Sequence, residues 1–193
     1  MRTSALLLLS LLAAGLTGSA APIPKDADIG KECLVNGGFE DGPDVEIYVA
    51  LDAGDTRIKG WTVTRGQIDY IGGDHWQHED GKRSLDLHGS PGYGGVKQSF
   101  KTTKGGTYKV TFLLAVNPGS NPLKKSVWVE AAGEKQKFSA DATGATHQKM
   151  YWKTQEWQFV ATGEETTLEI RTAETTDEFA GPALDAVSVK RTK

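Results

Sequence analysis

Most of the chain consists of short runs in which apolar and polar residues alternate, separated by turns rich in Gly, Asn, Asp and Pro. Successive side chains of a β-strand point to opposite faces, so this alternation predicts strands that bury one face. The clearest run is residues 107–115, and no window repeats apolar residues at the spacing of an amphipathic helix. Further strands are predicted at residues 60–64, 67–71, 84–87, 96–100, 126–130, 136–139, 156–160, 167–170 and 181–189.

About ten short strands joined by Gly-rich turns predict an all-β fold, an antiparallel β-sandwich of a single domain. The turns around Gly133 and Gly163 predict two of its hairpins, and the chain contains no internal repeat and no interdomain linker. A second β-prone stretch lies near the start of the folded part, at residues 34–42. We expect this stretch to be the first strand and to lie beside the last one.

The first 20 residues have the layout of a secretory signal peptide. A short positive start precedes a mostly apolar stretch, and small residues end at Ala20. The apolar stretch is too short to span a membrane. We therefore expect residues 1–20 to be a signal peptide, residues 21–31 a flexible leader, and residues 32–190 the β-sandwich domain.

Composition and charge exclude several classes of function. The 193 residues have a formal net charge of −3, and Lys and Arg are scattered among acids, so the chain lacks the basic patch of a nucleic-acid-binding protein. No second long apolar run follows the first, which argues against a membrane span. The single cysteine, Cys33, cannot form an internal disulfide, and we expect it to be a small buried apolar residue rather than a reactive thiol.

Short motifs spread over nearly all of the expected mature chain carry a family resemblance. They are Gly-Trp-Thr-Val at 60–63, Ile-Asp-Tyr-Ile at 68–71, Trp76, Asp-Gly-Lys-Arg-Ser-Leu-Asp-Leu at 80–87, Gln-Ser-Phe at 98–100, Gly-Thr-Tyr at 106–108, Asn-Pro at 117–118 and Gly-Pro-Ala-Leu-Asp at 181–185. In this order they resemble the choice-of-anchor C family, which is related to the plant cell-wall proteins called domain of unknown function 642. The resemblance implies a galactose-binding-like jelly roll, a fold shared with many carbohydrate-binding modules, but no known activity. No sorting tail follows the last predicted strand, so we expect free secretion rather than surface anchoring.

Two acidic residues near the ends of the domain are candidate metal ligands. Glu40 follows the Gly-rich turn at residues 36–38, and Asp185 lies in the last predicted strand. Calcium prefers carboxylate and backbone carbonyl oxygens in flexible geometry, so a Ca²⁺ ion could join the two terminal segments. The arrangement resembles related jelly rolls in which a structural calcium joins the first and last strands. The alternative is that both acids are solvated or cap turns.

Aromatic residues in loop-like stretches are the candidate ligand-binding residues. Sugar sites use flat aromatic faces with a few polar groups nearby. Trp76, Tyr93 and Trp152 lie in such stretches, and packing beneath a loop is the alternative for each of them. The remaining tryptophans lie in strand patterns and are expected in the core: Trp61, Trp128 and Trp157.

The polar loop that surrounds Trp76 holds two histidines three residues apart. His75 and His78 lie between Gly-rich turns, and their order matches no zinc-protease signature. We interpret residues 74–80 as a surface loop that could contact a ligand through Trp76.

No catalytic motif stands out. A glycosidase needs two carboxylates positioned on either side of one bond. The chain has 25 acidic residues, and the sequence does not single out any pair of them. The Gly-x-Ser-x-Gly elbow of α/β hydrolases is missing from the sequence. We therefore expect a secreted, non-catalytic module that binds carbohydrate or another extracellular polymer. A structural or protein-interaction domain of the cell envelope is the main alternative, and a glycan-active hydrolase the third.

Overall fold

The computed structural model describes residues 28–89, 92–175 and 179–193. Its strands are β1 (Tyr48–Asp52), β2 (Thr62–Arg65), β3 (Gln67–Ile71), β4 (Ser84–Asp86), β5 (Gly95–Lys101), β6 (Thr107–Val116), β7 (Lys124–Ala131), β8 (Glu134–Asp141), β9 (Lys153–Val160), β10 (Glu165–Thr172) and β11 (Pro182–Arg191). Among these described residues there is no helix that could cross a membrane. The expected signal peptide and residues 21–27 of the expected leader lie outside the described residues.

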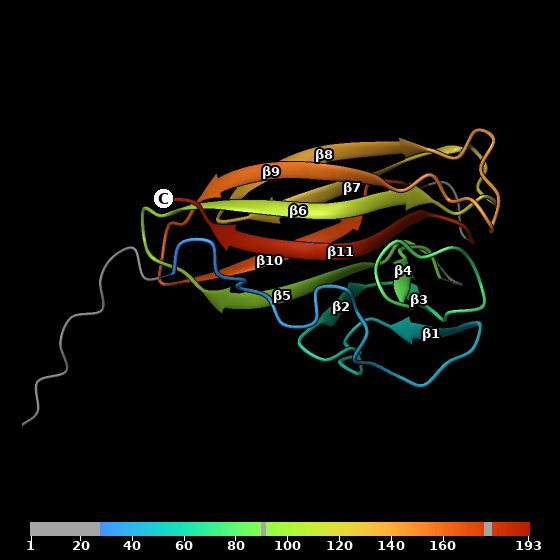
Figure 1. Ribbon diagram of the computed structural model, residues 1–193, viewed down its shortest axis with the longest axis horizontal. Coiled ribbons are helices and arrows are strands. Elements are labelled where there is room, and N and C mark those ends of the chain that lie inside the picture. The colour runs from blue at the N-terminus through green and yellow to red at the C-terminus, as the bar shows by residue number, and fades with distance from the viewer. Residues whose placement is uncertain (1–27, 90–91, 176–178) are drawn as a thin grey trace, which may run out of the picture.

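The strands form two antiparallel sheets that pack face to face. One sheet has the order β1-β3-β4-β11-β6-β9 and the other the order β2-β5-β10-β7-β8 (Figure 1). The predicted antiparallel β-sandwich is therefore confirmed. In the view of Figure 1, β1, β3 and β4 lie at the end of the molecule away from the carboxyl terminus.

The alternation of inward and outward side chains along the strands builds the core between the two sheets. In β3, Ile68 and Tyr70 point inward and are fully buried, while Gln67 and Asp69 point outward and are less buried. Leu114 and Leu184 occupy directly paired inward positions on β6 and β11 and are also fully buried. Burying apolar side chains in this way stabilises the sandwich by roughly 1.5–3 kcal/mol per large side chain.

A second, smaller apolar cluster covers the outer face of the six-stranded sheet. Ile71, Ala115 and Ala183 contribute to it from β3, β6 and β11. Trp76 and Met150 cover them from two loops, residues 72–83 and 142–152. We call residues 72–83 the cover loop.

The two terminal segments lie side by side, as predicted. Ile29 and Glu32 form isolated bridges with Arg191 and Lys190, and the backbone N–H of Cys33 donates to the Val189 carbonyl at 2.9 Å. Residues 34–42, however, form turns and bends rather than the strand we expected, and the edge strand β1 was not predicted.

Two of the residues expected in the core lie elsewhere. Trp128 lies on the outer face of β7, because its neighbours Val127 and Val129 take the inward positions. The Lys135 ammonium lies 5.1 Å from the centre of the Trp128 ring. Cys33 is half-buried rather than buried, and burial, followed by the charge of Glu32, raises the pKa of its thiol.

Candidate functional site

A groove of about 450 Å³ runs over the outer face of the six-stranded sheet at β1, β3 and β4. Its floor is formed by residues that face each other across the strands. Ala50 of β1 pairs with Asp69 of β3, and Asp69 pairs with Asp86 of β4. Because directly paired residues point to the same side of a sheet, these three side chains form one row across the floor. The small side chain of Ala50 leaves space beside the carboxylate of Asp69.

Asp86 is held by three hydrogen bonds. The Asn117 amide donates to Oδ2 at 2.8 Å, and the backbone N–H groups of His88 and Gly181 donate to Oδ1 at 2.9 and 3.0 Å. Burial raises the pKa of Asp86 to about 7, although these bonds act in the opposite direction. Asp86 therefore joins the ends of β4, β6 and β11 behind the groove.

Asp69 differs from Asp86 because no hydrogen bond or ion pair engages its carboxylate within the described ranges. Burial raises its pKa to about 6. An ionised carboxylate has two acceptor oxygens and no donor. Asp69 is thus the unsatisfied acceptor of the floor.

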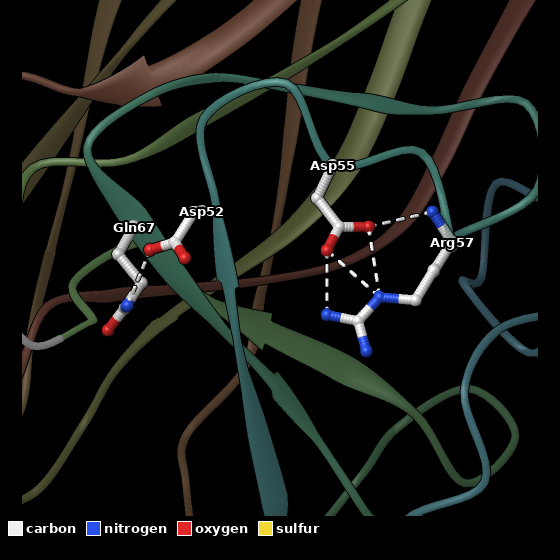
Figure 2. Close-up of polar contacts among 4 residues, drawn as sticks. All are labelled: Asp52, Asp55, Arg57 and Gln67. Atoms are coloured by element: carbon white, nitrogen blue, oxygen red, sulfur yellow. Dashed lines mark hydrogen bonds and ion pairs between the residues drawn. The ribbon is translucent and has the colours of Figure 1, made fainter.

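Polar contacts fix the groove wall at the end of β1 and also the turn that follows this strand. The Gln67 amide donates to Asp52 Oδ1 at 2.7 Å, which fixes the side chain of Gln67 at the groove wall (Figure 2). In the turn that follows, the Arg57 guanidinium donates to Asp55 Oδ2 through Nη2 at 2.7 Å and through Nε at 2.9 Å (Figure 2). This paired contact lowers the pKa of Asp55.

Two exposed aromatic side chains border the groove. Tyr48 is 54% exposed and Phe179 is 66% exposed, although both are large and apolar. His75 of the cover loop packs edge-on against Tyr48, with ring centroids 5.7 Å apart. His75 also contacts Trp76, so the second apolar cluster supports this wall of the groove.

The structure places the predicted ligand-binding residues differently from our expectation. Trp76 is only 4% exposed, and its indole donates to Ser84 Oγ at 2.8 Å. Trp152 packs partly buried against the same cluster, and its indole donates to the carbonyl of Gln77 at 2.9 Å. Trp76 is therefore not available as a stacking surface, and the cover loop contributes His75 instead.

Tyr93 contacts other residues than these two tryptophans. Its ring is 5.7 Å from that of His88, and its hydroxyl donates to the carbonyl of Thr175. Its backbone has a φ of 58°, in the left-handed region that few non-glycine residues adopt. Tyr93 is not among the described residues that line the groove.

The charge of the predicted metal ligand Glu40 acts on the other predicted ligand, Asp185. Asp185 is fully buried, and its pKa is raised to about 8, first by burial and then by the charges of Asp80 and Glu40. The backbone N–H of Ala186 donates to its Oδ1 at 2.6 Å. No Lys or Arg of the described residues forms an ion pair with Asp185.

Glu40 is held against the cover loop. Its Oε1 accepts hydrogen bonds from the backbone N–H groups of Lys82 and Arg83 at 2.9 and 2.8 Å. No group of three or more His, Cys, Asp or Glu side chains in the described part of the chain is placed to hold a metal ion. A calcium site at Glu40 and Asp185 would therefore take its remaining ligands from backbone carbonyls, amide side chains or water.

A second hollow of about 410 Å³ lies beside the amino-terminal segment, where Cys33, Lys31 and Lys101 line it. Its two aromatic residues, Phe100 and Tyr108, are 6% and 3% exposed. This hollow offers no exposed aromatic face among the described residues, so the groove is the better candidate for binding a ligand.

The fold is that of a jelly-roll β-sandwich, and comparison with known proteins gives its family. Residues 32–190 match the family described as protein of unknown function DUF642, and the chain belongs to this family. Comparison with curated protein sequences gives no match.

Solved structures share the fold at low sequence identity. TmCBM61, solved in complex with β-1,4-galactotriose, is 16% identical, with a TM-score of 0.51 over 83% of this chain and 99% of that one. An arabinose-bound α-L-arabinofuranosidase, MgGH51, is 13% identical, with a TM-score of 0.56 over 84% of this chain. The chain spans only 27% of the length of that enzyme. At such identities the likeness describes the fold alone.

Proposed function

We propose that the protein is a carbohydrate-binding module whose ligand lies in the groove over β1, β3 and β4. The observation that carries this proposal is the pairing of two exposed aromatic rings, Tyr48 and Phe179, with the hydrogen-bonding floor around Asp69. Aromatic faces stack on the C–H surfaces of sugar rings, and nearby polar groups bond the hydroxyls. The fold shared with TmCBM61, a protein solved with a galactotriose, supports the same class of ligand.

In this proposal the protein binds its glycan without cleaving it. The two carboxylates of the groove, Asp69 and Asp86, are neighbours, and a pair of carboxylates is what a glycosidase requires. However, Asp86 is fully buried, and both of its oxygens accept N–H groups of the protein, so it is not free to act on a bond in the groove. Incubation with a bound polysaccharide tests this point, and release of reducing sugar would favour the hydrolase.

The proposal includes secretion and a structural calcium. The layout of residues 1–20 supports export into the extracellular space or cell envelope. Calcium bound between Glu40 and Asp185 would favour the ionised form of Asp185, whose pKa is raised to about 8 by burial and by its acidic neighbours. Such an ion would fasten the cover loop, and with it the His75 wall, to the last strand.

A polysaccharide array followed by calorimetry tests the binding site. We expect Tyr48→Ala and Phe179→Ala each to weaken binding about tenfold or more, a loss of about 1.4 kcal/mol, while the melting temperature stays within a few degrees of wild type. Tyr151→Ala is the matched control, because Tyr151 is 41% exposed and does not line the groove. Unchanged affinity in both groove variants would refute the site, and a blank array would favour the alternative of a protein-interaction domain.

A further inference from the structure

The charge of the groove restricts which glycans fit it. Its described lining contains the carboxylates of Asp69 and Asp86 but no Lys or Arg. By contrast, surface acids elsewhere are commonly paired with a cation, as Glu169 is with Arg65 at 2.8 Å. A glycan in the groove therefore meets negative charge that no cation of the lining offsets.

Of the two carboxylates in the groove, only that of Asp69 accepts no hydrogen bond from the described residues. Asp86 uses both oxygens to accept N–H groups. Asn117 donates to Asp86, and its Oδ1 accepts the N–H of Gly119 at 2.9 Å. The Asp69 carboxylate forms no hydrogen bond or ion pair with the described residues, and the small side chain of Ala50 leaves room beside it. The two oxygens of one carboxylate can accept hydrogen bonds from two adjacent hydroxyl groups.

We infer that the groove selects neutral glycans and excludes uronic acids, with Asp69 accepting hydrogen bonds from a pair of adjacent sugar hydroxyls. This inference rests on the proposed function and adds the class of ligand. A uronic acid would bring its carboxylate beside Asp69 in a partly desolvated groove, where repulsion between like charges is stronger than in water. A neutral sugar has hydroxyl donors to offer at the same place.

Because Asp69 can be protonated, the expected discrimination against uronic acids depends on pH. The groups that face Asp69 are Asp86 on β4, Tyr48 and Asp52 on β1, and His75 on the cover loop. The pKa of Asp69 is raised to about 6 by burial, so its carboxylate is ionised at pH 8 and mostly protonated near pH 4.5. Burial, together with His147 and His78, lowers the pKa of His75, which adds no positive charge at pH 8. Exclusion of uronic acids should thus be strongest at pH 8 and weaker at pH 4.5, where sugar carboxylates stay ionised.

Matched oligosaccharides test the inference. The probes are cellohexaose, β-1,4-mannohexaose and β-1,4-galactohexaose, each beside its C6-oxidised form, in which every hydroxymethyl group is oxidised to a carboxylate. Titration calorimetry at pH 8 should show that the neutral member of at least one pair binds and that its oxidised form binds at least tenfold more weakly. Asp69→Asn should weaken the neutral ligand about tenfold and bring the two members of the pair within about threefold of each other at both pH values. Asp74→Asn, at an exposed position of the cover loop, is the matched control and should change neither affinity.

The possible outcomes distinguish failure of the inferred ligand class from failure of the proposed carbohydrate-binding function. If the wild-type protein binds the oxidised form as tightly as the neutral form, or more tightly, the inference is overturned, although the protein would still be a carbohydrate-binding module. Discrimination that persists in Asp69→Asn would remove Asp69 from its assigned role. Binding of none of the six probes, together with a blank polysaccharide array, would refute the proposed function and the inference with it.

Discussion

Replacing Asp69 by Asn should make the folded protein more stable at pH 8. In the wild type the carboxylate lies in a groove where it loses part of its hydration and gains no hydrogen bond or ion pair from the described residues. Asparagine has nearly the same shape but carries no charge, so it avoids the cost of burying one. The variant should therefore lose affinity for glycan while it gains stability.

The size of the gain follows from the pKa. Burial raises the pKa of Asp69 from 3.8 to about 6, a difference of about two units. At 1.36 kcal/mol per unit this corresponds to about 3 kcal/mol as an upper limit. The groove is open to water, which screens the charge, so we expect about 1 kcal/mol. For a domain of this size such a change raises the melting temperature by roughly 2–4 °C.

The gain should depend on pH in a defined direction. A carboxyl group whose pKa is higher in the folded state favours folding at low pH, and this advantage is lost as the pH rises from 3.8 through about 6. Below this window both states are protonated, and the charge costs nothing. The difference between Asp69→Asn and wild type should thus be near zero below pH 4 and fully developed above pH 7.

Urea unfolding of the two proteins at pH 4 and pH 8 measures this difference. Asp74→Asn serves as the control, because the residue is exposed and its substitution should leave the free energy of unfolding unchanged at both pH values. A lower stability of Asp69→Asn at pH 8, or an equal effect at both pH values, would refute the reasoning. The first result would mean that Asp69 makes a stabilising contact in the folded protein.

Two further predictions concern the surroundings of the groove. If calcium joins Glu40 and Asp185, a chelator should lower the melting temperature of the wild type, because an ion bound only by the folded state stabilises it. Glu40→Gln should remove that response to the chelator. An unchanged melting curve of the wild type would refute the calcium site. Trp76→Ala should cost about 3–5 kcal/mol of stability, because the indole is buried and hydrogen-bonded to Ser84. A melting temperature of Trp76→Ala equal to that of the wild type would show that the ring is not packed as described.

The sheet strands could be predicted from the sequence because their pattern is local. The strand predicted at residues 107–115 is β6, and the strand predicted at residues 67–71 is β3, whose alternation buries Ile68 and Tyr70. In the structure the same alternation leaves Asp69 on the outer face of the sheet. Which outward residues share a groove depends on the strand order β1-β3-β4, and that order arises from long-range pairing that no local pattern records.

The position of Trp76 could not be predicted for the same reason. Its polar neighbours in sequence indicated an exposed loop, but the cover loop lies across the sheet and is fastened to residues 142–152. The backbone N–H of Gln77 donates to the His147 carbonyl at 2.7 Å, and the N–H of Met150 donates to Gln77 Oε1 at 2.9 Å. These contacts join segments about 70 residues apart in sequence. They turn a loop that looks exposed into the cover of a small apolar core.

The groove gathers several features that work against folding. Asp69 is partly buried without a partner among the described residues, Asp86 is a fully buried acid, and Tyr48 and Phe179 expose large apolar rings to water. Each of these is unfavourable for the isolated domain, and residues kept against stability are typical of functional sites. A glycan would relieve two of the costs at once, since its hydroxyls would satisfy Asp69 and its ring faces would cover the aromatic side chains. The gain in stability predicted for Asp69→Asn and its predicted loss of affinity are therefore two measurements of one feature, and they should appear together in the same variant.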